Sequence, residues 1–259
     1  MAGRVALVTG STSGIGLGIA RALASKGHSI LLTGFGSEDV IQKHKENFQR
    51  DFGMSVSHFE GDFSRPDEVD GLCREIRKSH PGGIDILVNN AGFQYVSPVD
   101  EFPLETWTSM MSVMLTAPFM LIKEFSPDMK SKGWGRIINI SSTHGHVASV
   151  NKSAYVTAKH GILGLTKVVA LEFARTGVTC NAVCPGYVST ELFVKQAEEL
   201  VAKHKISFQE AKEVLLEKHP TRECATEEQI GEAVNFVCSS ACDNMTGSSL
   251  VIDGGWTAV

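Results

Sequence analysis

A tyrosine and a lysine, Tyr155 and Lys159, stand four positions apart in a segment with helical patterning. Four helical residues complete about one turn, so both side chains would lie on one face. A nearby ammonium stabilises phenolate, whose parent phenol otherwise has a pKa of about 10. Ser142, which ends an earlier apolar run, could hydrogen-bond the reacting oxygen. The three residues predict a proton-transfer site, although a Tyr–Lys pair alone is also typical of a solvated helix surface.

A glycine-rich turn follows the first apolar run of the chain, Val5–Thr9. Glycines permit a tight turn and let backbone amides approach a pyrophosphate, and the N-terminus of the next helix adds partial positive charge. The spacing differs from the commoner G-x-G-x-x-G fingerprint, and such turns also occur for packing reasons. Its position at the first strand–helix turn favours dinucleotide binding. The residues predicted to bind are Gly10, Thr12, Ser13, Gly14, Ile15 and Gly16.

The end of the second apolar run, Leu32-Thr33-Gly34-Phe35-Gly36, should determine which dinucleotide binds. NADP sites usually place a basic residue at this point, for the 2′-phosphate. No Lys or Arg occurs between Ile30 and Ile41, and the two acidic residues there would repel a phosphate. The sequence therefore predicts NAD as the cofactor, with Phe35 near it. Asp62 and Phe63 follow the third run and could border the adenine, with a solvated turn as the alternative for the aspartate.

Apolar runs alternate with helical patterns almost from end to end of the chain. Strands that are apolar throughout are what a parallel sheet covered on both faces requires. Right-handed crossovers then give a doubly wound α/β sheet of the Rossmann type. Without repeats or flexible linkers, one domain is expected over residues 1–259. The predicted strands are Val5–Thr9, Ser29–Thr33, Val56–Glu60, Ile84–Val88, Arg136–Ile140, Val178–Val183 and Ser249–Ile252.

One stretch, residues 190–219, interrupts this alternation near the C-terminal third of the chain. It holds two helical patterns, Leu192–His204 and Ser207–His219, where a further strand and helix would be expected. Long excursions between core elements are often lids over a site. A helical substrate lid is therefore predicted, with a purely structural helical hairpin as the alternative.

The composition excludes several classes of protein. With 259 residues, 42% hydrophobic and 20% charged, the chain is neither disordered nor of low complexity. Its net charge of −5 argues against a nucleic-acid partner. We expect no membrane partner and a cytoplasmic location, because no spanning run and no signal or transit segment is recognisable from Met1 onward. Cys180 and Cys184 bracket an apolar strand, which favours buried thiols over a metal site or a disulfide framework.

Five motifs follow one another along the chain: Thr9-Gly10-x-x-x-Gly14-x-Gly16, Asn89-Asn90-Ala91-Gly92, Ser142, Tyr155-x-x-x-Lys159 and Pro185-Gly186. In this order they resemble the short-chain dehydrogenase/reductase family over essentially the whole chain. The resemblance implies a seven-stranded sheet, a homotetramer and Tyr155 as the catalytic acid/base. It also implies that Lys159 lowers the tyrosine pKa and holds the nicotinamide ribose, and that Ser142 orients the substrate oxygen. Further cofactor contacts are then Asn89, Asn90, Ala91, Gly92, Pro185, Gly186, Val188 and Thr190.

Several stretches are similar to one group within this family, the D-3-hydroxybutyrate dehydrogenases of bacterial type. They include Gly34-Phe35-Gly36, Ala148–Tyr155, Lys195-Gln196 and Gly254-Gly255-Trp256-Thr257. The expected activity is NAD-dependent interconversion of D-3-hydroxybutyrate and acetoacetate, a hydroxy acid and a keto acid. Taken singly, the polar residues could instead stabilise loops. The resemblance implies substrate contacts from Gln94, Ser142, His144, Lys152, Tyr155, Tyr187 and, on the lid, Gln196.

One position departs from the family pattern. The family commonly has an asparagine on the helix after the fourth strand, and the matching residue here is Met114. A thioether cannot donate a hydrogen bond, so a water linking Lys159 to solvent would lose an anchor. Ser112 is expected to face elsewhere on the helix. Three hypotheses stay open: an active dehydrogenase with a slower or rerouted proton path, a cofactor-binding protein with weak catalysis, and a different short 3-hydroxy acid or a thioester as substrate.

Overall fold

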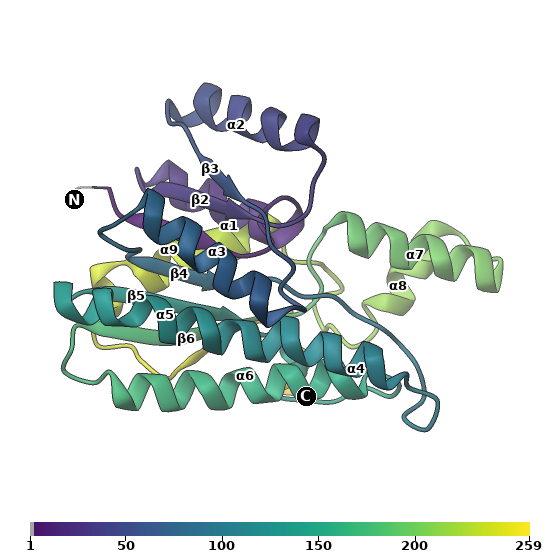
Figure 1. Ribbon diagram of the computed structural model, residues 1–259. Helices are drawn as coiled ribbons and strands as arrows, with labels where there is room; N and C mark the ends of the chain where they lie inside the picture. Colours follow the sequence, from purple (N-terminus) through teal and green to yellow (C-terminus); the bar gives the residue numbers. More distant parts are fainter. Residues whose placement is uncertain (1–2) are drawn as a thin grey trace.

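Seven parallel strands form a single sheet in the computed structural model, which describes residues 3–259; Met1 and Ala2 lie outside it (Figure 1). The order is β3-β2-β1-β4-β5-β6-β7, so the direction of winding reverses between β1 and β4. This is the doubly wound sheet that the sequence predicts. The strands are β1 (Val5–Val8), β2 (Ser29–Thr33), β3 (Ser57–Phe59), β4 (Ile86–Asn89), β5 (Gly135–Ile140), β6 (Val178–Pro185) and β7 (Ser249–Ile252).

Alternate residues of each strand enter two separate hydrophobic cores, one on each face of the sheet. On β1, Leu7 belongs to one core, whereas Ala6 and Val8 belong to the other. Successive side chains of a strand point to opposite faces, so a strand covered on both sides must be apolar throughout. The first core is closed by α3 (Pro66–Ser79), α5 (Ala117–Lys132) and α6 (Ser153–Glu172), and the second by α1 (Gly14–Ser25), α2 (Glu38–Phe52) and α9 (Glu227–Cys238).

The helices of the interrupting stretch project beyond the sheet (Figure 1). They are α7 (Glu191–His204) and α8 (Phe208–Leu215). The first agrees with the predicted pattern, but the second ends at Leu215 rather than at His219. The chain turns at Leu216, which is buried, and the backbone N–H of His219 donates to the Leu216 carbonyl at 2.9 Å. Burial of Leu216 and His219 against the main body ends the helix early.

The helical stretch after β4 is not uniform. It consists of α4 (Leu104–Met111), a π-helical turn (Ser112–Thr116) and α5. The sequence pattern predicts ordinary α-helical spacing for this stretch. The prediction is wrong for the five residues of the π-helical turn. An inserted π turn rotates the residues that follow it and is often found at functional sites. Met114 lies in the middle of this turn and is buried.

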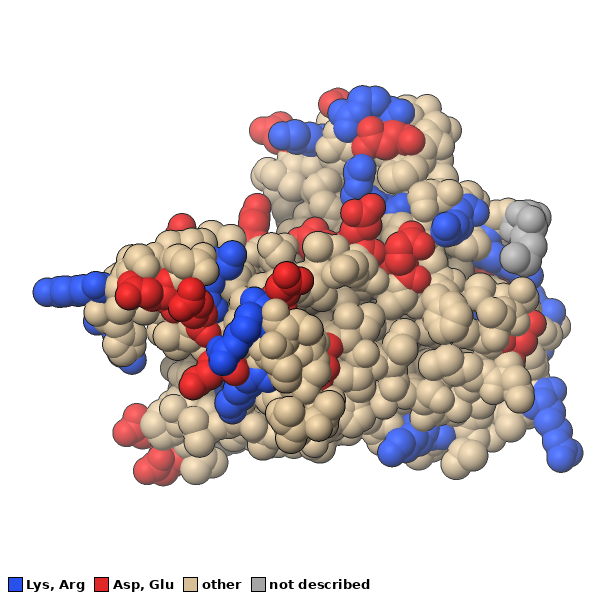
Figure 2. Space-filling model, turned by 180° about the vertical axis from the view of Figure 1, so that it is seen from behind, with Lys and Arg blue, Asp and Glu red and all other residues tan. Residues whose placement is uncertain are grey.

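Acidic and basic side chains are interspersed over the face of the molecule seen in Figure 2, including the projecting helices. Of the helices in residues 3–259, none is both long enough and apolar enough to cross a membrane. All six cysteines are free thiols, and Cys180 and Cys184 are both buried in β6.

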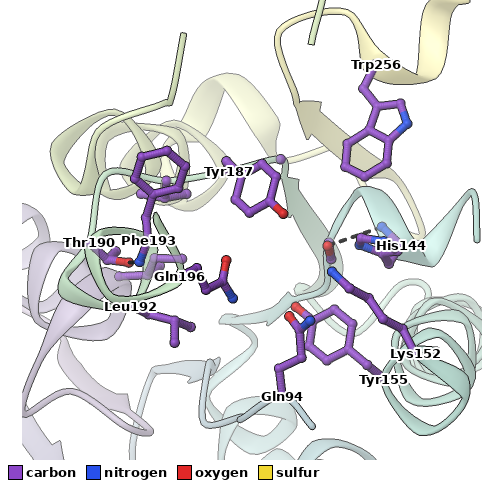
Figure 3. A pocket seen from close by; sticks show the side chains of 14 residues that line it. Gln94, His144, Lys152, Tyr155, Tyr187, Thr190, Leu192, Phe193, Gln196 and Trp256 are labelled. Atoms are coloured by element: carbon purple, nitrogen blue, oxygen red, sulfur yellow. Dashed lines mark hydrogen bonds between the residues drawn. The ribbon is translucent and has the colours of Figure 1, made fainter. Parts of the chain in front are cut away.

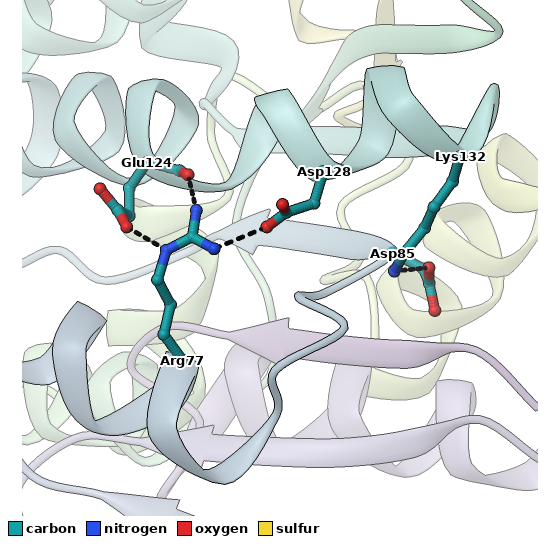
Figure 4. Close-up of polar contacts among 5 residues, drawn as sticks. All are labelled: Arg77, Asp85, Glu124, Asp128 and Lys132. Atoms are coloured by element: carbon teal, nitrogen blue, oxygen red, sulfur yellow. Dashed lines mark hydrogen bonds and ion pairs between the residues drawn. The ribbon is translucent and has the colours of Figure 1, made fainter.

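Two ion-pair groups fasten α5 to the rest of the fold (Figure 4). Arg77 on α3 pairs with Glu124 and with Asp128, the latter at 2.9 Å. Lys132, at the end of α5, donates to Asp85 at 2.7 Å. The other Asp85 oxygen accepts the backbone N–H of Val5 at 2.9 Å, so this buried carboxylate joins α5 to the start of the sheet.

We predict that Asp85→Ala lowers the free energy of unfolding by about 1–3 kcal/mol, because it leaves the Val5 N–H and the Lys132 ammonium without their acceptor. Chemical denaturation measures the change. The matched control is Arg50→Ala, whose partner Asp51 lies at the surface; removing that exposed pair should cost less than about 0.5 kcal/mol. Equal stability of both variants would show that Asp85 does not fasten the two elements.

Candidate active site

The candidate site lies where β4, β5 and β6 end at the same edge of the sheet. Asn90 follows β4, Ser142 follows β5, and Pro185 ends β6. Carboxyl ends of parallel strands meet at one edge, and a crevice opens where the winding reverses. The start of α6 brings Tyr155 and Lys159 to the same edge.

The glycine turn between β1 and α1 has the conformation that the sequence predicts. Gly10 and Gly14 have φ of +62° and +53°, values that side-chain-bearing residues rarely adopt. A Cβ on Gly16 would lie 2.1 Å from the Gly10 carbonyl oxygen, so only glycine fits there. Ser13 precedes α1 without capping it through its side chain. The first amides of α1 therefore remain available to an anion.

Hydrogen bonds lock this turn to the segment after β4. The Thr9 hydroxyl accepts the backbone N–H groups of Asn90 and Ala91 at 2.9 and 3.0 Å. The Asn90 amide in turn donates to the carbonyls of Thr9 and Gly10 at 2.9 and 3.2 Å. At the edge of the turn, Thr12 donates to the Phe35 carbonyl at 2.9 Å, which brings the end of β2 beside it.

These features fit a nicotinamide dinucleotide. Gly10 and Gly16 let the turn pack closely against Asn90 and Ala91, and the first amides of α1 have no side-chain cap. Phe35 is 67% exposed beside the turn, so its ring is free to contact a ligand. The residues that would hold the phosphates are those of the turn, and residues of the segment from Pro185 to Thr190 line the same cavity as Ile15 and Tyr155.

Two predicted cofactor residues, Phe63 and Asn89, have side chains that point into the fold, whereas the role of the third, Asp62, stays a prediction. The Phe63 side chain is buried in the core beneath β2 and β3, so only its backbone faces outward. The Asn89 side chain donates to Asn139 at 2.8 Å inside the sheet, where it joins β4 to β5. The Asp62 carboxylate accepts the Ser64 N–H at 2.8 Å, as a turn aspartate does. These side-chain contacts hold together the segments around the crevice. The sequence alone does not predict them, because it does not give the direction in which each side chain points.

A cavity of about 120 Å³ adjoins the crevice (Figure 3). It brings together all seven residues predicted to contact the substrate, from five separate segments of the chain. Four predicted cofactor residues, Ile15, Gly186, Val188 and Thr190, also reach it. The seven are Gln94, Ser142, His144, Lys152, Tyr155, Tyr187 and Gln196.

Three further residues line the cavity but were not predicted to contact the substrate or the cofactor. They are Leu192, Phe193 and Trp256. Leu192 and Phe193 lie in the first turn of α7, whose N-cap is Thr190. Trp256 comes from the C-terminal segment, and its ring lies edge-on to His144 with centroids 5.1 Å apart. The Gly254-Gly255-Trp256 motif is visible in the sequence, but nothing local indicates that it reaches this cavity.

Ser142, Tyr155 and Lys159 form one connected group. Ser142 and Tyr155 both line the cavity, hydrogen bonding from Ser142 acts to lower the pKa of Tyr155, and the Ser142 hydroxyl donates to the Pro185 carbonyl at 3.4 Å. Lys159 is buried, donates to the Ile140 carbonyl at 2.8 Å and lies 5.5 Å from the centre of the Tyr155 ring. Burial lowers the pKa of Lys159 to about 8, so it remains mostly charged at neutral pH.

The pKa of Tyr155 differs from the expectation. Burial raises it, and the hydrogen bond with Ser142 only opposes that effect. The Lys159 ammonium, 5.5 Å from the ring centre, donates its hydrogen bond to the Ile140 carbonyl. A phenol buried in this way needs additional positive charge beside it to ionise near neutrality, and an oxidised nicotinamide ring carries such a charge.

The polar groups around the cavity have distinct charges. Burial, together with the charges of Lys152 and Lys218, lowers the pKa of His144 to about 4, so this imidazole is neutral at pH 7. Its Nε2 lies 3.0 Å from the Ser149 hydroxyl. Burial also lowers the pKa of Lys152, which stands at the N-cap of α6. Lys152 is therefore the cation of the cavity lining.

Met114 packs in a small apolar cluster behind the tyrosine. The cluster contains Met110, Ala154 and Ala158, and Tyr155 packs against it. A Cβ on Gly92 would lie 3.3 Å from the Met114 sulfur, so the thioether fills the space beside the segment after β4. An apolar side chain thus occupies the place where the family commonly has an amide.

Comparison with known proteins agrees with this geometry. The short chain dehydrogenase family model matches residues 4–200. The chain belongs to the short-chain dehydrogenase family. It is 48% identical to a D-beta-hydroxybutyrate dehydrogenase of Cupriavidus necator, over 99% of this chain and 98% of that relative. It is 45% identical to a D-beta-hydroxybutyrate dehydrogenase of Rhizobium meliloti, over 98% of this chain and 99% of that relative. The L-sorbose reductase of Gluconobacter frateurii, solved with NADPH and L-sorbose, superposes with a TM-score of 0.94 at 28% identity, covering 100% of this chain and 98% of the reductase.

The chain is therefore a short-chain dehydrogenase, an oxidoreductase that uses a nicotinamide cofactor. Both hydroxybutyrate relatives match over nearly full length, so the resemblance includes the α7–α8 stretch and the C-terminal segment with Trp256. The family model ends at residue 200, before α8 begins.

We predict that Gly16→Ala weakens dinucleotide binding by at least about tenfold, because the added methyl group collides with the Gly10 carbonyl and the Asn90 amide. Fluorescence titration with reduced dinucleotide measures the affinity, and thermal unfolding reports any general damage. The matched control is Gly71→Ala in α3, where the nearest atom to the new methyl group is 3.8 Å away. That variant should bind normally; if both variants do, the turn does not hold the phosphates.

Proposed function

We propose that this protein is an NAD-dependent dehydrogenase that interconverts D-3-hydroxybutyrate and acetoacetate. The observation that carries the proposal is the cavity, in which one lysine and three neutral polar side chains stand around the Ser142–Tyr155 pair. The relatives with 45–48% identity over nearly full length support the same activity. A small anionic hydroxy acid needs one cation and several donors near the group that takes its hydroxyl proton.

In this mechanism Lys152 pairs with the substrate carboxylate. Gln94, His144 and Gln196 supply neutral hydrogen-bond donors, since His144 is uncharged above about pH 4. Their convergence fixes the 3-hydroxyl beside Ser142 and Tyr155. Fixing both ends of a small molecule reduces the entropy that must be lost on reaching the reactive geometry.

Proton transfer then involves Tyr155. A nicotinamide dinucleotide held by the glycine turn and by the segment after β6 would supply the hydride exchange at the alcohol carbon. The Tyr155 oxygen takes the hydroxyl proton during oxidation and gives it back during reduction. Ser142 donates a hydrogen bond to the same substrate oxygen, and the Lys159 ammonium favours the phenolate through its charge.

NAD is the proposed cofactor because the residues after β2 carry no group for a 2′-phosphate. Phe35 is exposed there, and Glu38 and Asp39 begin α2. The L-sorbose reductase neighbour is solved with NADPH, so the family's fold admits either dinucleotide. The difference therefore depends on the few residues of this chain near the end of β2.

We also propose that residues 190–219 act as a substrate lid. Leu192, Phe193 and Gln196 on α7 form one side of the cavity, and α7 joins the body through the segment after β6. Apolar side chains over the cavity would exclude water during hydride transfer.

The proposal extends to a homotetramer in the cytoplasm. Helices α5 and α6 expose Phe119, Val168 and Leu171, which a second copy could cover.

We predict saturable oxidation of D-3-hydroxybutyrate with NAD, with the L enantiomer, longer 3-hydroxy acids and NADP each much poorer. Spectrophotometric assay of reduced dinucleotide measures all four. In Tyr155→Phe, kcat should fall by about 10²–10⁴-fold because the proton acceptor is lost, while NAD affinity persists. Tight NAD binding without turnover of any hydroxy acid would favour the hypothesis of a cofactor-binding protein that has lost catalysis.

A second test addresses Met114. An amide at this position can hold a water beside the cluster behind Tyr155, so we expect Met114→Asn to raise kcat severalfold and to change its dependence on pH above about 8, where Lys159 loses its charge. Met114→Leu, which stays apolar, is the matched control and should leave the profile unchanged. Identical profiles for Asn and Leu would show that the departure from the family pattern does not affect the proton path.

A further inference from the structure

His219 lies beneath the cavity although it does not line it. The side chain is 1% exposed and follows the turn that ends α8. Its Nε2 accepts the backbone N–H of Tyr187 at 3.1 Å. Tyr187 is the residue that forms the cavity wall after β6. The imidazole therefore joins the end of the α7–α8 stretch to the wall of the site.

The same ring packs against both aromatic walls of the cavity. Its centroid lies 5.5 Å from that of Tyr187 and 5.3 Å from that of Trp256. Two glycines make room for it: a Cβ on Gly186 would lie 2.5 Å from His219 Nε2, and one on Gly254 would lie 3.3 Å from its Cδ2. Three distant segments thus meet at one buried ring.

The hydrogen bond determines the form of the imidazole. Nε2 can accept a hydrogen bond only if it carries no proton, so the neutral ring must hold its proton on Nδ1. His219 Nδ1 is buried and has no partner within residues 3–259. A protonated ring would present an N–H to the Tyr187 N–H, and this would break the contact.

Titratable groups lie near this ring and near the residues that it contacts. Burial lowers the pKa of His219, and the Asp253 carboxylate partly opposes that effect. Asp253 is itself occupied by hydrogen bonds from Gly255 and Thr257. The remaining groups on the packed elements are the Tyr187 phenol, Lys218 beside Trp256, and His144 on the far side of Trp256.

We propose that His219 is a positioning residue for the substrate: its neutral imidazole holds the Tyr187 backbone and the Trp256 ring in place, and so couples the α7–α8 stretch to the substrate cavity. This rests on the proposed function, in which the cavity receives the hydroxy acid. His219 contacts the segment after β6 and not the glycine turn between β1 and α1, so its loss should weaken binding of the acid more than binding of the dinucleotide.

Two variants separate the hydrogen bond from the charge. His219→Gln keeps a side-chain oxygen that can accept the Tyr187 N–H but does not ionise. His219→Leu keeps similar bulk and has no acceptor. The matched control is His160→Gln on α6, because His160 is exposed and its Nδ1 contacts only the Val156 carbonyl of its own helix. Thermal unfolding confirms that each variant is folded.

We expect His219→Leu to raise KM for D-3-hydroxybutyrate about tenfold at pH 7.5, with kcat and dinucleotide affinity changed much less, because the Tyr187 N–H is left buried without an acceptor. His219→Gln should restore KM to near the wild-type value. Because burial lowers the pKa of His219, wild-type KM should rise only at a pH below the ordinary histidine value of about 6.5, as the ring is protonated, and His219→Gln should lack this rise. A wild-type KM in His219→Leu, or the same acidic rise in His219→Gln, would overturn the proposal.

A measurement without turnover distinguishes this proposal from the proposed function. The chain has three tyrosines, so ¹⁵N-tyrosine labelling gives three backbone amide signals for nuclear magnetic resonance. The Tyr187 amide should shift as His219 titrates in the wild type and in His160→Gln, and should not shift in His219→Gln. If the wild type oxidises no hydroxy acid but this coupling is present, the proposed function fails alone; if the amide does not follow His219, the positioning role fails whatever the activity.

Discussion

Thr9 and Asn90 join two strands at the point where the order of the sheet reverses. Four hydrogen bonds between Thr9, Gly10 and the Asn90–Ala91 segment fix the glycine turn against the end of β4. A parallel sheet leaves a crevice at such a reversal, because the connections on its two sides leave in opposite directions. With these two segments locked together, the amides at the start of α1 and the Ser142–Tyr155 pair have fixed positions on one crevice.

Burial determines the protonation states of the ionisable groups in that crevice. Burial lowers the pKa of His144 to about 4 and that of Lys159 to about 8, and it raises that of Tyr155. The site thus holds a neutral imidazole as a donor, a lysine that is mostly charged at neutral pH, and a phenol that keeps its proton until positive charge approaches. Each state follows from the lower stability of a charge in a less polar environment.

The last third of the chain completes the cavity from several directions. Leu192, Phe193 and Gln196 come from α7, and Trp256 comes from the segment after β7. His219 packs between Tyr187 and Trp256 and contacts both aromatic walls. A cavity built from such distant segments can respond to a change in any one of them, since packed interiors transmit small displacements.

Local pattern was sufficient for most of the fold. The alternation of apolar runs and helical patterns predicts the parallel sheet, because a strand buried on both faces must be apolar throughout and a helix must repeat every 3.6 residues. The predicted bounds of β2 and β7 agree with the structure. The π-helical turn at Met114 was not predicted, because one regular α-helical period was assumed for the whole stretch after β4.

Motif spacing likewise predicted which residues gather at the cavity, because short motifs placed after parallel strands must meet at one edge of the sheet. Side-chain direction and burial required the tertiary structure. Phe63 and Asn89 turn inward, α8 stops at Leu215, and Trp256 and His219 enter from segments far along the chain. The sequence by itself determined the order of the elements and the chemical groups available, since both depend on local periodicity and residue type. Only the packing of distant segments decided which groups face the cavity and which charge each one carries, since desolvation depends on every neighbour in space.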